Sequence, residues 1–240
     1  FVIDIDKTGK NYASNVAKVK KAGIKYVARV VVFPLGGNPS QVKSQQYWAN
    51  KYQIVQKAIN LGADEIQLDY IRYNTKQPPV EKNTQDVFAV LKYFREKTKS
   101  QGVPLQIDVF GETSYKPSLR IGQNIKTFAP QIDVLCPMLY PSHFEPYKKH
   151  AITPYETVYN SLESIKRQFN QKVPFKIVAY IELSNYRYKM SHAQRIKYIQ
   201  AQMKAVKDAN VHGWYAWSPN NHYDILFEAL RGKSLQTAKN

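Results

Sequence analysis

The residues best suited to chemistry in this sequence are acidic side chains that recur in one short pattern. Three segments repeat a Gln–apolar–Asp triplet: Gln67-Leu68-Asp69, Gln106-Ile107-Asp108 and Gln131-Ile132-Asp133. Side chains alternate between the two faces of a strand, so the Gln and Asp of each triplet share a face. Polar residues in a buried strand cost free energy unless they are paired or used. The pattern therefore indicates candidate functional carboxylates.

Position within each strand separates the three aspartates. Asp69 and Asp108 come late, near the carboxyl ends where barrel enzymes place their active sites, whereas Asp133 comes first and favours a cap or ion pair at the opposite end. Arg72 follows Asp69 by three residues, close enough to keep that carboxylate ionised, and it is also a candidate for binding substrate. An ionised carboxylate there suits a nucleophile or a stabiliser of an oxocarbenium-like transition state. A purely structural Asp–Arg pair is the alternative.

A second acid would complete such chemistry, and two residues compete for that role. Asp108 is the natural partner of Asp69, and Glu112 lies four residues beyond it, in the following loop. Burial and a negative neighbour would raise the pKa of either group and allow it to act as a general acid. The alternatives are a structural role for Asp108 and an ordinary surface position for Glu112.

Candidate substrate-binding residues occupy three other strand ends. Tyr140 and His143 lie in a proline-rich segment with a restricted backbone, and their polar groups could hydrogen-bond sugar hydroxyls. Glu182 ends another β-rich run, and Trp217 ends the last one, where an indole could stack on a ring. For each of these residues a structural role is the alternative.

Short β-rich runs carry all of these residues, and amphipathic segments alternate with the runs. We expect strands over residues 1–6, 26–33, 65–71, 105–110, 132–139, 175–181 and 213–217. We expect helices over residues 41–61 (stopped by Gly62), 84–100, 156–169 and 192–209 (with Ser191 as N-cap). This alternation implies parallel strands joined by crossover helices.

The predicted fold class is α/β, a TIM-type (β/α)8 barrel that lacks, or is trimmed of, its first strand. The reason is that seven strands can be read where a closed barrel has eight. An open doubly wound sheet is the alternative. The 240 residues suit a single barrel domain over residues 1–232, followed by a polar, disordered tail over 233–240.

Composition and sequence motifs limit the classes of partner and cofactor that we expect this protein to bind. The net charge of +17 attracts polyanions, but the lysines are spread over the helices, so an anionic cell-wall polymer explains the charge as well as nucleic acid does. We expect no nucleic-acid partner, because no motif for one occurs. The single cysteine, Cys136, excludes an intrachain disulfide, and no metal-ligand or phosphate-loop spacing occurs, so we expect no metal and no cofactor. The start, FVIDID, is not a signal peptide, and no apolar run is long enough to span a bilayer.

Several segments together resemble a bacterial family of glycoside hydrolase domains, long catalogued as a domain of unknown function and related to the α-amylase-like barrels. They are DEIQLDYIRY (64–73), IDVFG (107–111), IGQ (121–123), DVLCPMLYPSHF (133–144), PYE (154–156) and QAQMKAVKDANVHGWYAWSP (200–219) with Tyr223. The sequence departs from the family pattern at Lys7-Thr8-Gly9 after Asp6 and at Pro174-Phe175-Lys176-Ile177. Both segments line the cleft in family members, so substrate preference does not carry over with the resemblance.

The resemblance implies an exported enzyme of the bacterial envelope, periplasmic or otherwise outside the cytoplasm, whose signal or anchor segment is not in this chain. A lysine- and asparagine-rich member of this kind resembles spirochaetal proteins, for which a peptidoglycan lytic transglycosylase activity is implied. A glycoside hydrolase acting on peptidoglycan or on another polysaccharide and a non-catalytic glycan-binding barrel are the alternatives. We expect a monomer that associates at most peripherally with the envelope.

Overall fold

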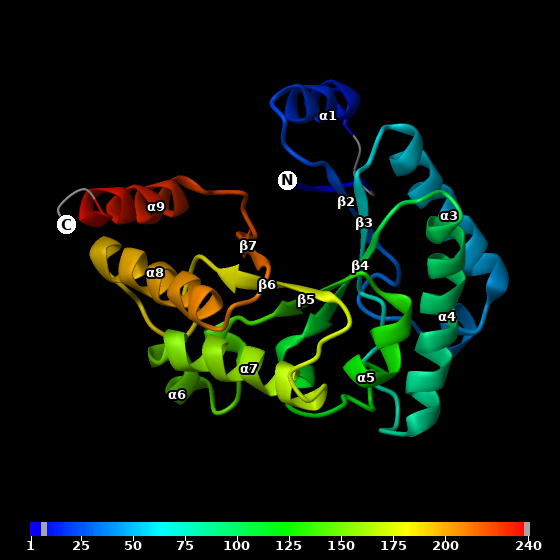
Figure 1. Cartoon of the computed structure of the whole chain (residues 1–240). Coiled ribbons are helices and arrows are strands. Elements are labelled where there is room, and N and C mark those ends of the chain that lie inside the picture. Colours follow the sequence, from blue (N-terminus) through cyan, green and yellow to red (C-terminus); the bar gives the residue numbers. More distant parts are fainter. Residues whose placement is uncertain (6–8, 238–240) are drawn as a thin grey trace. The chain divides into compact units, whose positions relative to one another are not determined.

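The computed structural model describes residues 1–5 and 9–237, in which seven strands alternate with helices (Figure 1). The strands are β1 (Val2–Asp4), β2 (Val27–Val31), β3 (Glu65–Asp69), β4 (Leu105–Phe110), β5 (Val134–Met138), β6 (Lys176–Glu182) and β7 (Gly213–Trp217). All seven predicted strands are confirmed. Their order in the sheet follows the chain from β1 to β7. A doubly wound sheet would reverse its order at a switch point, so the TIM-type barrel prediction is confirmed over that alternative.

The helices follow the strands along the chain. They are α1 (Tyr12–Lys21), α2 (Pro39–Val42), α3 (Gln45–Asn60), α4 (Glu81–Lys99), α5 (Ile125–Phe128), α6 (Tyr147–Ile152), α7 (Pro154–Gln168), α8 (His192–Asp208) and α9 (Asp224–Thr237). Short 3₁₀ helices η1 (Gly111–Ser114), η2 (Ala129–Gln131) and η3 (Pro141–His143) lie between them. The helices predicted as α4, α7 and α8 are confirmed.

Two predicted boundaries were wrong for local reasons. The helix expected over residues 41–61 is two helices, because Ser44 leaves the helical conformation and its side chain accepts a hydrogen bond from the Tyr47 amide as the N-cap of α3. At the other end of the chain, α9 continues through Thr237, so residues 233–237 are helical rather than disordered. The departure from the family pattern at Asp6, Lys7 and Thr8 lies outside the described residues.

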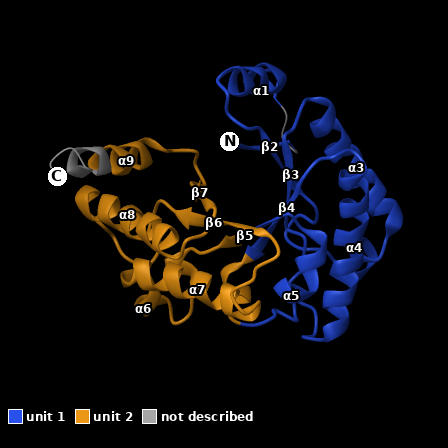
Figure 2. Ribbon diagram, viewed as in Figure 1, with its two compact units in different colours: residues 1–109, 116–135 blue, residues 110–115, 136–240 orange. Residues whose placement is uncertain are grey.

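Contacts within the chain define two compact units, coloured separately in Figure 2. Unit 1 comprises residues 1–109 and 116–135, and unit 2 comprises residues 110–115 and 136–240. The assignment of residues 1–232 to one domain remains a prediction.

Unit 1 is built on the parallel pairing of β1 with β2, β2 with β3, and β3 with β4. Helix α4 covers this unit with a fully buried apolar stripe at helical spacing, formed by Val87, Val90, Leu91 and Phe94. The register aligns Gln67 of β3 with Gln106 of β4. Asp69 and Asp108 each lie two residues further on, so they occupy the same face at the same height.

Unit 2 is built on the parallel pairing of β6 with β7, which aligns Glu182 with Trp217. Helix α7 buries Val158, Leu162 and Ile165 completely. Helix α8 begins at a capping box, in which Ser191 and Gln194 each satisfy a backbone amide of the other. The strand ends of this unit are therefore held by a well-formed helical layer.

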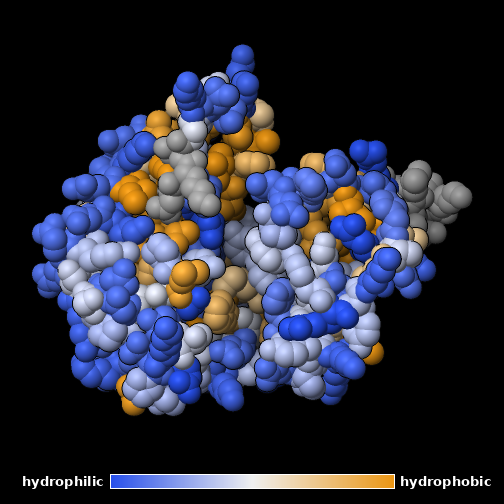
Figure 3. Space-filling view, turned by 180° about the vertical axis from the view of Figure 1, so that it is seen from behind, coloured by the Kyte–Doolittle hydropathy of each residue, from blue (hydrophilic) through white to orange (hydrophobic). Residues whose placement is uncertain are grey.

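The surface in Figure 3 is largely hydrophilic, with smaller hydrophobic patches. No helix in residues 1–5 and 9–237 has both the length and the apolar character needed to cross a bilayer.

Candidate active site

Asp69, the last residue of β3, is held by a guanidinium from the neighbouring strand. Arg29 of β2 donates from Nε and Nη2 to Asp69 Oδ2 at 3.0 and 2.5 Å, and from Nη1 to Asp4 Oδ2 of β1 at 2.8 Å. Burial lowers the pKa of Arg29, but the nearby carboxylates, first Asp69 and then Asp108, more than offset this and hold its pKa above the ordinary value. Four adjacent strands, β1 to β4, thus place one cation among three carboxylates.

Arg72, three residues after Asp69, contacts its own neighbours in the sequence. Its Nη1 donates to the carbonyl oxygen of Tyr73 at 3.0 Å, and its guanidinium carbon lies 5.0 Å from the centre of the Tyr70 ring. Burial lowers the pKa of the Arg72 guanidinium. The charge of Asp69 opposes this shift without reversing it. Arg72 therefore packs beside the carboxylate, while Arg29 binds it.

The backbone after Asp69 adopts an uncommon conformation. Tyr70 has a φ of 51°, in the left-handed region that non-glycine residues seldom occupy. This turn brings the Tyr70 amide to within 2.6 Å of Asp69 Oδ1. Each carboxylate oxygen of Asp69 thus accepts a hydrogen bond from the protein. Backbone strain such as that at Tyr70 is concentrated at functional sites.

Asp108 of β4 is buried, with 3% of its surface exposed, and its Oδ1 has no hydrogen-bond partner among the described residues. Burial raises the pKa of Asp108 well above its ordinary value, and the charge of Asp69 raises it further, while Arg29 opposes both. A carboxyl group in this setting holds its proton to a higher pH than an ordinary aspartate does. Asp69 and Asp108 thus form an acid pair with different environments, which is the arrangement that separates a general acid from an ionised partner.

The other residues of the repeated triplets support this pair or lie away from it. Gln67 donates to Gln106 at 3.1 Å, and Gln106 donates to Glu65 at 2.5 Å. The buried polar side chains in the layer beneath the aspartates are thus hydrogen-bonded to one another. Asp133 precedes β5, where it pairs with Arg95 and accepts the Leu105 amide at 2.7 Å. The prediction that Asp133 pairs at the start of its strand is confirmed.

Glu112, the rival candidate for the acid, lies in η1 of unit 2 and is exposed. The neighbouring Gly111 permits a close approach, since a Cβ there would lie 2.3 Å from the Phe144 ring and 2.6 Å from the Met138 carbonyl oxygen. The Glu112 side chain is thus solvated, whereas the Asp108 side chain is buried. Asp108 is therefore the better-placed general acid.

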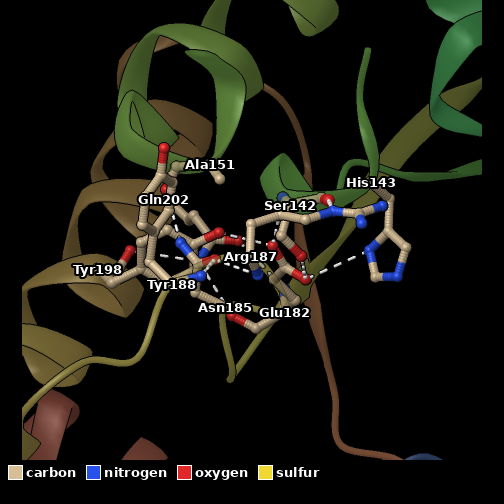
Figure 4. Close-up of polar contacts among 9 residues, drawn as sticks. All are labelled: Ser142, His143, Ala151, Glu182, Asn185, Arg187, Tyr188, Tyr198 and Gln202. Atoms are coloured by element: carbon tan, nitrogen blue, oxygen red, sulfur yellow. Dashed lines mark hydrogen bonds and ion pairs between the residues drawn. The ribbon is translucent and has the colours of Figure 1, made fainter. Parts of the chain in front are cut away.

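In unit 2, Glu182 is completely buried at the end of β6 and is surrounded by donors (Figure 4). Its Oε1 accepts the Ser142 amide at 2.7 Å and the Tyr198 hydroxyl at 2.6 Å, and its Oε2 accepts the Ser142 hydroxyl at 2.8 Å. His143 Nδ1 lies 3.4 Å from Oε2, and Gln202 bonds both the amide and the carbonyl of Glu182. Glu182 thus holds the η3 turn in place, instead of facing a substrate as its position at a strand end predicts.

The turn held by Glu182 carries an aromatic cluster, which we define as Tyr140, His143, Tyr186 and Trp217. The Tyr140 and Trp217 rings are stacked, with centroids 4.9 Å apart and an angle of 21° between their planes. His143 and Tyr186 lie against the same indole, with centroids 6.3 and 6.0 Å from it. Tyr186 is 48% exposed, so the cluster offers a ring face to solvent where a sugar could stack.

Sequence reasoning missed three residues of these arrangements. Arg29 and Asp4 join the acid pair, and Tyr186 joins the aromatic cluster. The signal for Arg29 was present, because an arginine inside the apolar run YVARVVVF is costly unless it is paired. No comparable pattern marks Tyr186, which lies in the loop after β6. Among residues 1–5 and 9–237, no three His, Cys, Asp or Glu side chains are grouped to hold a metal ion.

Comparison with known proteins places these features in a family context. The model of the family DUF4015, described as "Putative glycosyl hydrolase domain", matches residues 38–223. This range contains Asp69, Asp108 and the aromatic cluster. No significant match was found among curated proteins.

Solved structures with a similar fold include enzymes that act on glycans. The spore cortex-lytic enzymes SleL of Bacillus cereus and Bacillus megaterium align with TM-scores of 0.64 and 0.63 at 16% and 13% identity, covering 91% of this chain and 62% of each of theirs. A class V chitinase from Pseudomonas fluorescens aligns with a TM-score of 0.69 at 12% identity, covering 94% of this chain and 86% of that one. The chain thus spans less than two thirds of the SleL enzymes. At these identities the likeness concerns the fold.

Proposed function

The chain belongs to the DUF4015 family of glycosyl hydrolase domains, and on that premise we propose that it cleaves a glycosidic bond in the glycan strands of bacterial peptidoglycan. The observation that carries the proposal is the acid pair of unit 1. Asp108, whose pKa is raised by burial, and Asp69, whose carboxylate is bound by Arg29, supply the two functions that glycosidic cleavage needs.

The reaction begins with proton transfer from Asp108 to the glycosidic oxygen. The bond from that oxygen to the anomeric carbon breaks, and the leaving sugar departs as an alcohol. Asp69 stabilises the positive charge that develops at the anomeric carbon. An incoming hydroxyl then attacks this carbon and returns a proton to Asp108, which restores the starting state.

The identity of the incoming hydroxyl separates two reactions. If it comes from water, the enzyme is a hydrolase and the product has a reducing end. If it is the C6 hydroxyl of the same muramyl residue, the enzyme is a lytic transglycosylase and the product is a 1,6-anhydro sugar. A transglycosylase needs only one acid/base, which Asp108 supplies, whereas a hydrolase uses both Asp108 and Asp69.

Three features support peptidoglycan as the substrate. The net charge of +17 favours an anionic polymer. The aromatic cluster supplies stacking surface, as a sugar site requires. The SleL enzymes of similar fold are named as spore cortex-lytic. Peptidoglycan lies outside the cytoplasm, so we propose an extracytoplasmic location. We also propose that the protein acts as a monomer.

Digestion of purified peptidoglycan, followed by mass spectrometry of the soluble muropeptides, tests the proposal. Release of anhydro ends identifies a transglycosylase, and release of reducing ends identifies a hydrolase. Asp69→Asn and Asp108→Asn should each lower the rate by about 10²–10⁴-fold, whereas Glu112→Gln should stay near the wild-type rate. Binding without release by the wild-type protein would favour the non-catalytic alternative, and release from chitin alone would point to a different polysaccharide.

A further inference from the structure

We propose that unit 2 contains a carboxylate-binding subsite centred on Arg195, which recognises the acidic substituent of a carboxylate-bearing amino-sugar strand. The inference rests on the proposed function and deepens it, because it names the group that distinguishes the substrate from a neutral glycan. The subsite is a pocket of about 280 Å³, whose polar walls are Ser184, Tyr186, Arg195, Ser218, Asn220 and His222.

The pocket lies where a barrel enzyme binds its substrate. Ser184 follows the carboxyl end of β6, and Ser218 directly follows the carboxyl end of β7. The loops after these strand ends form the binding face of this fold. Thus the pocket opens among substrate-binding loops rather than on the opposite, structural face.

The guanidinium of Arg195 is poorly satisfied by the protein. Its Nε is buried and has no hydrogen-bond partner among the described residues. Its Nη2 reaches only Leu183 O and Ser184 Oγ, each at the long distance of 3.4 Å. It makes no ion pair with any described carboxylate. A buried donor of this kind is costly unless a ligand completes it, and the planar guanidinium fork matches a carboxylate.

The residues that line the 280 Å³ pocket favour an anion over a cation. No Asp or Glu among the described residues lines this pocket. Asp224 and Glu228 line a second pocket of about 220 Å³, which Arg195 and His222 also line, and Glu228 pairs there with His192 at 2.6 Å. Arg195 also lies one turn inside α8, so the positive end of the helix dipole adds to its field.

Tyr186 connects the pocket to the aromatic cluster. Its ring lines the pocket and lies 6.0 Å from the Trp217 ring, which is stacked on Tyr140. A sugar stacked on this exposed aromatic edge would direct a substituent toward Arg195. The pocket is slightly smaller than the roughly 300–1,000 Å³ of a typical ligand site, so it suits a substituent better than a whole sugar.

Two carboxylates of peptidoglycan have this chemistry. One is the lactyl carboxylate on the muramic acid ring, and the other is a carboxylate of the attached peptide. Binding is therefore measured by calorimetry with three probes: a peptide-free tetrasaccharide of alternating N-acetylglucosamine and N-acetylmuramic acid, the same tetrasaccharide with its peptides, and chitotetraose. The protein carries Asp108→Asn so that the probes are not cut.

We expect the peptide-free acidic tetrasaccharide to bind at least about tenfold more tightly than chitotetraose, because a charge-assisted bond to Arg195 forms only with the former. Adding Arg195→Gln should remove this preference and leave chitotetraose binding unchanged. Arg195→Lys should retain part of it. Lys197→Gln removes one charge from the exposed side of the same helix and should retain all of it. A preference seen only with the peptide-bearing probe assigns the peptide carboxylate as the ligand.

Equal binding of all probes, a preference that survives Arg195→Gln in a folded protein, or no binding of either acidic probe would each overturn the inference. Thermal melts of every variant identify unfolded protein, and Arg195→Lys then serves as the test. The outcome is independent of the proposed cleavage. Charge-dependent binding without digestion would leave the subsite standing, whereas digestion without charge-dependent binding would refute the subsite alone.

Discussion

Asp108 is buried beside Asp69, and the negative charge of Asp69 raises the pKa of a carboxyl group that burial alone already raises. Arg29 satisfies Asp69 with two hydrogen bonds, whereas Oδ1 of Asp108 has no partner among the described residues. Asp69 is thus paired with a cation, whereas burial and the charge of Asp69 make Asp108 the group that binds a proton more tightly.

Replacement of Asp108 by Asn should make stability less dependent on pH. The pKa of Asp108 is higher in the folded than in the unfolded chain, so the wild-type protein loses stability as pH rises from the ordinary Asp range to the raised folded pKa. Asp108→Asn has no such proton and escapes this loss. Its melting temperature should exceed that of wild type by a margin that grows through this window and is constant above it. Parallel pH dependence of the two melting curves would contradict the assigned protonation.

The two arginines near Asp69 should differ in their effect on Asp108. Arg29→Gln removes a charge that lowers the pKa of Asp108, so that pKa should rise and the alkaline limb of the activity profile should move to higher pH. Arg72→Gln is the matched control, since Arg72 hydrogen-bonds Tyr73 and is not among the charges that shift Asp108. Carboxyl NMR titration measures the effect directly. Equal shifts in the two variants would mean that Arg29 has no special relation to the pair.

Glu182 should act on sugar binding through the turn that it holds. Glu182→Gln keeps the size but loses the charge that accepts bonds from Ser142 and Tyr198, so it should lower the free energy of unfolding by about 1.5–3 kcal/mol. Tyr198→Phe removes one of these bonds and should cost about 1 kcal/mol. Both variants should displace the turn that carries His143 and leave Asp108 in place. They should therefore raise KM more than they lower kcat. A selective loss of kcat would instead indicate a direct catalytic role for Glu182.

Trp217 should contribute to glycan affinity without entering the chemistry. Trp217→Ala removes the ring on which Tyr140 stacks and against which Tyr186 lies, and KM should rise about three- to tenfold. Trp217→Phe should recover part of the loss. Steady-state kinetics on soluble glycan strands separate KM from kcat. An unchanged KM would exclude the aromatic cluster from the sugar-binding surface.

The order of the seven strands, three of the main helices and the face on which Asp69 and Asp108 lie were readable from the sequence, whereas α1, α5, α6 and α9 were not predicted. The readable features are local properties, because a strand alternates its side chains and an amphipathic helix repeats its apolar positions whatever lies beside them. Their late positions in β3 and β4 were also readable, since these follow from where each apolar run ends.

Contacts between distant segments fix which cation binds Asp69, which groups surround Glu182 and why the pKa of Asp108 is raised. Arg72 is three residues from Asp69 in sequence, yet Arg29 is forty away and lies on the adjacent strand, where the β2–β3 register brings its fork to the carboxylate. Glu182 is buried by residues from η3 and α8, which no spacing along β6 reveals. The raised pKa of Asp108 depends on burial and on a charge from a neighbouring strand, and both exist only once the strands have paired.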